Sequence, residues 1–209
     1  MLVEKIIEVR KAAKPRRFKQ SFDLIINLKG IDLSKPENRF SFELQLPEGR
    51  GKDVKVCVFA DSLAPQAKEV ADIVITKAEI EKIAENKAKM KAIANSCDWF
   101  LAEASLMPLI GKVWGVVLGP RGKMPKPLPP NIQLKPIIEV MRRSIRLVLK
   151  STPVIMASIG NEGMSDSAIA RNAEAVLNAV KEKLPKGKEN IKSVYAKLTM
   201  GKAVRLDGI

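Results

Sequence analysis

Hydrophobic and polar residues alternate strictly near both ends of the chain. Close to the C-terminus, Val194, Ala196 and Leu198 alternate with four polar residues, which are Ser193, Tyr195, Lys197 and Thr199. A period of two predicts a strand with one buried face and one solvated face. The same period predicts strands over residues 22–28, 40–46, 145–149 and 154–159. We expect these four to form two hairpins, because each pair is adjacent along the chain.

The outer segments also contain two stretches with helical periodicity. Residues 2–13 place apolar side chains on one face and end before Pro15, and residues 166–184 carry a longer apolar stripe that ends before Pro185. Proline ends a helix because it lacks the N–H group and clashes with the preceding turn. Helices and alternating strands together indicate an α+β domain.

The middle of the chain has a different pattern, in which apolar runs show little alternation. It predicts strands over residues 54–59, 73–75 and 99–102 and helices over residues 63–70, 80–94, 106–112 and 134–143. Short apolar strands that alternate with helices are typical of a parallel sheet covered on both faces. We therefore expect a Rossmann-like, three-layer α/β domain in this region.

A segment rich in glycine and proline, residues 47–53, separates the two patterns. The economical explanation is an insertion, with one discontinuous α+β domain formed by residues 1–53 and 144–209 and an inserted α/β domain formed by residues 54–143. The chain would then cross between the domains near residues 47–53 and near residue 143, which would make a two-stranded hinge.

Charge indicates the kind of partner. Lys and Arg number 37 against 23 Asp and Glu, so the formal net charge is +14. An excess of this size favours a polyanionic partner, most often a nucleic acid, with an anionic membrane surface as the alternative. Aromatic residues make up only 4% of the chain. We therefore expect a few placed contacts and recognition of shape instead of a stacking platform.

Composition also excludes several kinds of site. The chain has no histidine, which removes histidine metal sites, catalytic triads and imidazole bases. Cys57 and Cys97 stand alone and far apart in the sequence, so we expect buried thiols in a reducing compartment and no disulfide framework. No metal site and no cofactor are expected. The start has no signal-peptide pattern, and the apolar run 113–118 is too short to span a bilayer, so we expect a soluble cytoplasmic protein.

Two segments of the outer domain are candidates for RNA contact. Phe18 is flanked by Arg16, Arg17 and Lys19; it could stack on a base or ribose while the cations neutralise phosphates, although a core phenylalanine in a basic loop is equally consistent. The polar face of residues 193–199 offers hydroxyl, phenol and ammonium groups to an oxygen-rich partner. Gly201 follows, and it would permit close approach of a backbone.

The inserted domain carries the most enzyme-like segment, the basic loop of residues 119–127. Two glycines and three cations could present N–H groups and charge to a phosphate. The loop matches neither GxxxxGK[ST] nor GxGxxG, and a rigid proline-rich loop explains it as well. A nucleotide-dependent or RNA-modifying enzyme with a Rossmann-like core is the alternative function. Asp61, Asp72 and Asp98 lie near predicted strand ends, where we expect helix caps or solvated charges.

Three motifs in chain order carry a resemblance to a known family. They are Arg17-Phe18-Lys19, Leu118-Gly-Pro-Arg-Gly-Lys-Met-Pro125, and Ser193-Val-Tyr followed by Thr199-Met-Gly201. As a set they resemble the universal large-subunit ribosomal protein L-one family in its archaeal type, over essentially the whole chain and with the same split-domain plan. The chain departs from common bacterial patterns at Lys202, where a proline often stands, and at Lys126, which replaces the usual asparagine.

The resemblance implies a function and a set of RNA-binding residues. It implies a non-enzymatic protein of the cytoplasmic ribosome, monomeric when free, that binds large-subunit rRNA and forms the mobile stalk near the tRNA exit site. It further implies that the protein assists release of deacylated tRNA and represses translation of its own mRNA. Our own hypothesis is that the inserted domain is a lever that swings about the hinge and reaches tRNA. The residues that it implies for primary RNA binding are Glu8, Arg17, Phe18, Ser21, Ser193, Thr199, Met200 and Gly201. A secondary basic site would comprise Gly119, Arg121, Gly122 and Lys123.

Overall fold

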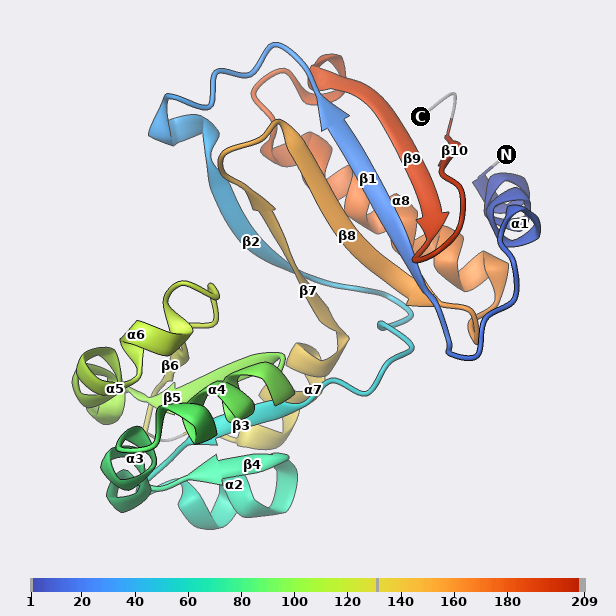
Figure 1. The fold of residues 1–209 in the computed structure, drawn as a ribbon. Coiled ribbons are helices and arrows are strands. Elements are labelled where there is room, and N and C mark those ends of the chain that lie inside the picture. The colour runs from blue at the N-terminus through green and yellow to red at the C-terminus, as the bar shows by residue number, and fades with distance from the viewer. Residues whose placement is uncertain (1, 131, 207–209) are drawn as a thin grey trace. The chain divides into compact units, whose positions relative to one another are not determined.

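A computed structural model describes residues 2–130 and 132–206 of the 209-residue chain. It divides into two compact units, Met1–Lys52 together with Arg143–Ile209, and Asp53–Arg142. These limits differ by one residue from those expected from the sequence. We call the first the outer unit and the second the inserted unit and describe each by itself (Figure 1).

The outer unit is organised around a four-stranded antiparallel sheet. Its strand order is β10 (Val204–Arg205), β9 (Ile191–Leu198), β1 (Ser21–Leu28) and β8 (Val154–Asn161). In β1 the even-numbered residues are buried and the odd-numbered ones are half-buried, and in β9 the residues Val194, Ala196 and Leu198 are buried. The buried face packs against α1 (Leu2–Ala12) and α8 (Asp166–Lys183), and these elements share one core (Figure 1). The alternation predicted over residues 193–199 is therefore confirmed.

The two predicted hairpins are wrong. β2 (Phe40–Gln45) pairs with β7 (Ser144–Leu149) in a separate two-stranded sheet, and β1 pairs with β8 and β9. β2 leads into the inserted unit and β7 leads out of it. Their pairing therefore brings together the two points of the chain where the insertion begins and ends. Alternation reports which face of a strand is buried, and it carries no information about the partner strand.

The inserted unit contains a four-stranded parallel sheet in the order β4-β3-β5-β6. Its elements in chain order are β3 (Val56–Phe59), α2 (Ala64–Val70), β4 (Ile73–Ile75), α3 (Lys77–Ala84), α4 (Lys87–Ser96), β5 (Trp99–Glu103), α5 (Met107–Val113), α6 (Gly115–Leu118), β6 (Lys126–Leu128) and α7 (Leu134–Arg143). Successive residues of β3 and β5 enter two different apolar clusters. Both faces of the sheet are thus covered, which explains the apolar runs, and the mixed α/β class is confirmed.

Several local predictions within the inserted unit were wrong. The helix expected over residues 80–94 is two helices, because Asn86 Oδ1 accepts hydrogen bonds from the N–H groups of Ala88 (3.0 Å) and Lys89 (3.1 Å) and so begins α4. The end of the basic loop, which was expected to run to residue 127, forms the strand β6. Short 3₁₀ turns are also present, at Ala104–Leu106 in the inserted unit and at Pro36–Asn38 and Gly187–Asn190 in the outer unit.

The two cysteines are buried, as predicted, but they are not isolated from each other. Cys57 lies on β3 and Cys97 ends α4, and both enter one apolar cluster. A hydrogen bond between the thiols is the main cause that lowers the pKa of Cys97 to about 7 and raises the pKa of Cys57 well above its usual value. Within residues 2–130 and 132–206, no helix has the length and apolar character needed to cross a bilayer.

Candidate nucleic-acid interface

The segments that carry the predicted RNA-binding residues meet where β1 begins and β9 ends. Phe22 on β1 lies opposite Leu198 on β9. Just outside this pair, the Thr199 N–H donates to Ser21 O (3.1 Å) and the Ser21 N–H donates to Thr199 Oγ1 (3.1 Å). Two predicted residues that are 178 positions apart in the sequence are thus direct neighbours.

Two large apolar side chains near this junction are exposed. Phe18 is 53% exposed and Met200 is 58% exposed, so Phe18 is not a core residue. Arg16, Arg17 and Lys19 beside it are exposed, and no hydrogen bond or ion pair joins any of them to another described residue. Exposed apolar groups among unpaired cations are the arrangement that a stacking and phosphate-binding surface requires.

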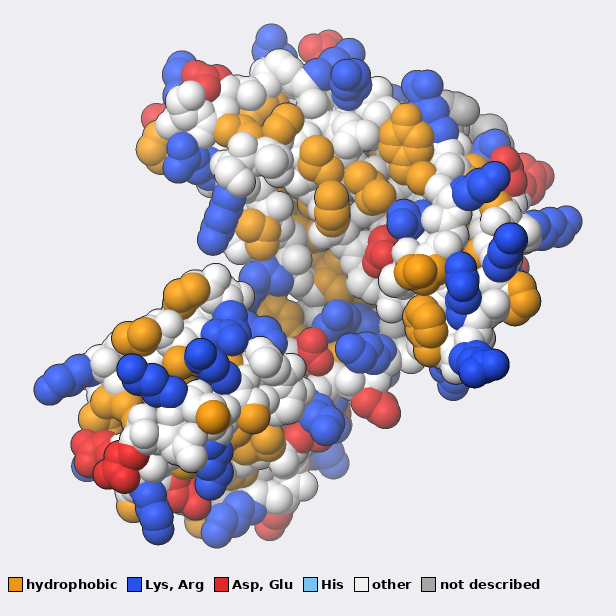
Figure 2. Space-filling view, in the orientation of Figure 1, with side chains coloured by type: hydrophobic (Ala, Val, Ile, Leu, Met, Phe, Trp, Pro, Cys, Tyr) orange, Lys and Arg blue, Asp and Glu red, His pale blue; other side chains and the backbone are white. Residues whose placement is uncertain are grey.

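The polar residues of β9 lie on the open face of the sheet. Ser193 Oγ accepts a hydrogen bond from Asn27 Nδ2 (3.0 Å), and Tyr195 and Lys197 lie opposite Ile25 and Asp23 of β1. Ile25 in turn faces Met156 of β8. The open face therefore combines an apolar row with polar groups on either side, and Figure 2 shows hydrophobic side chains on the visible face of the outer unit with Lys and Arg around them.

Gly201 permits a close approach, but to the protein itself. A Cβ at this position would lie 3.1 Å from Ala13 Cβ and 3.3 Å from Leu198 Cβ. Its N–H donates to Leu198 O (2.8 Å), and its φ is not positive. The glycine therefore lets the loop after β9 pack against the chain at the end of α1. The sequence-based interpretation placed this close approach at an RNA backbone.

Glu8 and Arg17 are exposed side chains outside this hydrogen-bonded junction. Glu8 lies on α1 and pairs with Lys5, with 2.9 Å between Nζ and Oε2. Arg17 belongs to the unpaired cations around Phe18. The junction thus unites Ser21, Thr199, Met200 and Gly201, while Glu8 and Ser193 lie further along their own elements.

Two residues at the centre of this junction, Gln20 and Glu162, were not predicted from the sequence. Gln20 is fully buried, and Glu162 lies just after β8. Their side chains hydrogen-bond to each other (2.9 Å), and Gln20 also bonds to Met200. A buried glutamine before a strand has no periodic signal in the sequence. Only its contacts identify it.

Asp23 is a partly buried carboxylate on the open face of the sheet. Burial raises the pKa of Asp23 above its usual value of 3.8, and the opposing charge of Lys197 partly offsets this. Its cross-strand neighbours are Lys197 on β9 and Ser158 on β8. Ionised Asp23 is therefore less favourable in the folded chain than in the unfolded chain.

Replacing Asp23 by asparagine is expected to increase stability at neutral pH but not in acid. Because the folded-state pKa is raised, the penalty is absent below about pH 3, grows as the pH rises through the folded-state value and is complete at pH 7. The gain at pH 7 should be about 0.5 kcal/mol or less, because the side chain is partly solvated. Urea unfolding of both proteins at pH 3 and pH 7 measures it. An equal difference at both pH values would contradict the assignment.

The basic loop of the inserted unit uses its cations internally. Lys123 Nζ donates to Ala94 O (2.8 Å) and Cys97 O (2.7 Å), and Arg121 Nη1 donates to Val117 O (3.0 Å). Gly122 has a φ of +64°, and a Cβ at Gly119 would lie 2.7 Å from Gly115 O. These residues satisfy carbonyl groups at the ends of α4 and α6. The geometry therefore supports a rigid packed loop. Because two of its cations already bind carbonyl groups of the protein, the loop is only a secondary candidate for phosphate contact.

Strand-end carboxylates in the inserted unit also have structural partners. Glu103, at the end of β5, accepts hydrogen bonds from the Asp61 and Leu63 N–H groups, both at 2.7 Å. Burial works against ionisation of Glu103, but these bonds outweigh it and hold its pKa below the usual 4.5. Asp72 Oδ2 accepts from the Val56 N–H (2.9 Å). Among the described residues, no group of three or more His, Cys, Asp or Glu could hold a metal ion.

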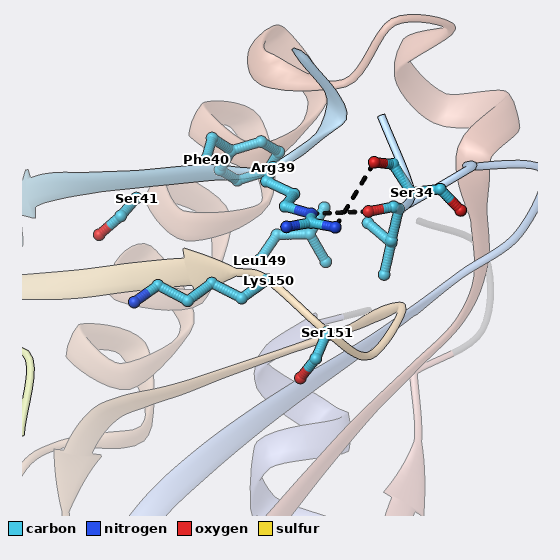
Figure 3. Close-up of a pocket in the computed structure, with 8 residues that line it drawn as sticks. Ser34, Arg39, Phe40, Ser41, Leu149, Lys150 and Ser151 are labelled. Carbon is cyan, nitrogen blue, oxygen red and sulfur yellow. Dashed lines mark hydrogen bonds between the residues drawn. The ribbon is translucent and has the colours of Figure 1, made fainter. Parts of the chain in front are cut away.

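A pocket of about 640 Å³ lies elsewhere, in the outer unit (Figure 3). Its walls are Leu33, Ser34, Arg39, Phe40, Ser41, Leu149, Lys150 and Ser151. Arg39 Nε donates to Leu33 O (2.6 Å), so the arginine holds the loop that forms one wall. The pocket lies beyond the Leu28 end of β1, whereas the junction lies at the Ser21 end. It contains no carboxylate and no paired nucleophile and base.

Comparison with known proteins identifies the family. Residues 9–202 match the Ribosomal protein L1p/L10e family. The chain belongs to this family. It is similar to proteins named large ribosomal subunit protein uL1, with 48% identity to that of Methanocaldococcus jannaschii over 98% of this chain and 94% of the relative. The values are 49%, 99% and 95% for Pyrococcus abyssi and 46%, 98% and 98% for Methanothermobacter thermautotrophicus.

Membership of the Ribosomal protein L1p/L10e family confirms the resemblance found in the three motifs. The matched residues 9–202 include every primary candidate except Glu8, which lies one position before them. The family consists of ribosomal proteins and not of enzymes, so the strand-end carboxylates need no catalytic explanation.

Proposed function

We propose that this chain is a structural constituent of the large ribosomal subunit in the cytoplasm and binds large-subunit rRNA through its outer unit. The relatives from M. jannaschii and P. abyssi are named as large-subunit proteins. One observation carries the proposed site: Phe18 and Met200 are exposed beside unpaired cations where β1 and β9 meet. Exposed apolar side chains cost free energy unless a partner covers them, and the cations favour a partner rich in phosphate.

The geometry supports recognition of a folded RNA by shape. Phe18 would stack on a base or ribose, and Met200 would supply an apolar contact next to it. Ser193 and Thr199 would hydrogen-bond to 2′-hydroxyl or phosphate oxygens. Ser21 and Thr199 are held in place by paired backbone and side-chain hydrogen bonds, so little ordering is required on binding.

The roles in tRNA release and in repression of translation depend on an RNA surface that lies on one of the two compact units. The outer unit would anchor the chain on rRNA, and the inserted unit would act as the mobile stalk that reaches exit-site tRNA and assists its release after deacylation. A similar RNA structure on the chain's own mRNA would bind the same surface, and this binding would repress translation. The division into two units supports this assignment of separate roles.

Crosslinking in cells followed by RNA sequencing tests the proposal as a whole. The expected result is a principal peak on large-subunit rRNA and a second peak on the chain's own mRNA, with exit-site tRNA crosslinked through the inserted unit. Crosslinks spread evenly over RNA without a large-subunit peak would contradict specific binding. In vitro, equal affinity for any duplex would also contradict specific binding.

Replacing Thr199 by valine is expected to weaken binding of the crosslinked rRNA fragment by about 5- to 100-fold. Valine keeps the shape but removes the hydroxyl, which leaves an RNA group without its partner and costs about 1–3 kcal/mol. Thr199→Ser keeps the hydroxyl and should bind almost as the wild type. The melting temperature should change little, because water can reach the Ser21 N–H that Thr199 now accepts from. Filter binding with parallel thermal melts measures both, and wild-type affinity in the valine variant would remove Thr199 from the site.

A further inference from the structure

Gln20 is a buried polar residue that connects the separate parts of the proposed RNA surface. Its side chain is 0% exposed. Oε1 accepts a hydrogen bond from the Met200 N–H (3.0 Å), and Nε2 donates to Glu162 Oε1 (2.9 Å) and to Lys14 O (3.4 Å). Both Nε2 protons and one acceptor site are therefore used within the protein.

Glu162 binds the same residue through its backbone as well. The Gln20 N–H donates to Glu162 Oε2 (3.0 Å), and the Glu162 N–H donates to Gln20 O (3.0 Å). The Gln20–Glu162 pair thus fixes both the side chain and the main chain of Gln20. Three segments meet at it: the turn that carries Phe18, the end of β8, and the loop that carries Met200.

We propose that Gln20, held by Glu162, is a positioning residue for RNA binding. It fixes the Met200 loop and the Phe18 turn in one arrangement before RNA arrives, without touching RNA itself. This inference rests on the proposed function. Ordering a backbone residue on binding costs conformational entropy, and an arrangement that already exists in the free protein avoids that cost. Without the Gln20 side chain, RNA binding would again have to order the loop and would be weaker by that cost.

Hydrogen bonds of neighbouring residues confine the effect of a change at Gln20 to the Met200 loop. Arg10 holds the segment after β8 by donating to Glu162 O (2.7 Å) and Met164 O (2.9 Å), and Thr199 remains bonded to Ser21. The sheet and its core therefore keep their own contacts when Gln20 changes. The loop beyond Thr199 loses the hydrogen bond that its Met200 N–H makes to Gln20.

The first test is Gln20→Ala in the full chain, with the rRNA fragment mapped by crosslinking. Affinity should fall about tenfold from the lost preorganisation, and the slope of log K against log salt should stay unchanged because no phosphate contact is removed. Hydrogen exchange of the Met200 amide should accelerate while that of Leu24 in β1 stays slow. A changed salt slope would mean that Gln20 contacts RNA, and unchanged exchange at Met200 would mean that it does not position the loop. Either result overturns the proposal.

The second test exchanges the two partners. Gln20→Glu alone places two carboxylates against each other and should weaken binding, whereas Gln20→Glu with Glu162→Gln restores a donor and an acceptor across the pair and should recover most of the affinity. Gln20→Glu with Glu189→Gln has the same net charge as the exchange but no restored pair, and it should stay weak. Recovery in this control, or none in the exchange, would contradict the proposal. This test decides the question even if Gln20→Ala fails to fold.

Phe18→Ala separates failure of this inference from failure of the proposed site. If Phe18→Ala loses affinity and Gln20→Ala does not, the RNA surface stands and Gln20 has no positioning role. If neither variant loses affinity, the RNA surface itself lies elsewhere and the inference falls with it.

Discussion

Replacing Phe18 by alanine is expected to weaken binding of the large-subunit rRNA fragment by about ten- to a hundredfold. The ring is 53% exposed, so its contacts in the free protein are few, and stacking on a base is worth about 1–3 kcal/mol. For the same reason the melting temperature should be almost unchanged. Filter binding and thermal melts of the same preparations measure the two quantities.

Val116→Ala supplies a matched control for Phe18, because Val116 is also an exposed apolar side chain but lies in the inserted unit. It should bind the fragment as the wild type does. Phe18→Tyr keeps an aromatic ring and should retain most of the affinity. If Phe18→Ala and Val116→Ala behave alike, the turn around Phe18 is not part of the RNA surface.

Replacing Asn172 by alanine is expected to lower the free energy of unfolding of the outer unit by about 2–4 kcal/mol. Asn172 is fully buried on α8, where Nδ2 donates to Gly49 O (2.9 Å) and Ile159 O (2.8 Å) and Oδ1 accepts from the Glu48 N–H (3.0 Å). Each buried group left without a partner costs about 1–3 kcal/mol. The loop at residues 47–51 can relax partly, so the total cost should be lower than the sum of the costs for all the groups that lose a partner.

The two units can be followed separately in that experiment. Both tryptophans, Trp99 and Trp114, lie in the inserted unit, whereas far-ultraviolet circular dichroism reports on both units. In urea, Asn172→Ala should shift the dichroism transition of the outer unit and leave the tryptophan fluorescence midpoint in place. Asn178→Ala, an exposed asparagine on the same helix, should shift neither. An equal shift of both signals would mean that the units unfold together.

Asn172 also defines where the chain leaves the outer unit. It fixes Glu48 and Gly49 against α8, Arg171 pairs with Glu48 (2.8 Å), and Asn161 Nδ2 donates to Gly51 O. Gly51 has a φ of +65°, and a Cβ there would lie 2.6 Å from Met164 Sδ. Most of the glycine-rich segment that the sequence marks as a linker is therefore bound to the outer unit by hydrogen bonds and packing.

The proposed RNA surface was predicted in part from the sequence. The family resemblance implied Phe18, Ser21, Thr199 and Met200 as RNA-binding residues, and the structure brings their segments together. Gln20 and Glu162 were missed, because a buried polar pair is recognised by the hydrogen bonds that it makes across the fold. Gly201 was expected to let a backbone approach closely, and in the structure its close contact is with Ala13.

The sequence by itself determined which faces of the strands and helices are buried, because side-chain direction repeats with the local backbone geometry of each element. The alternation of β1 and β9 and the bounds of α7 follow from that rule. Only the tertiary structure decided that β2 pairs with β7, that Cys57 meets Cys97 and that Gln20 joins three segments. These contacts link residues far apart in the chain, and periodicity within one segment is independent of the partner that the folded chain brings to it.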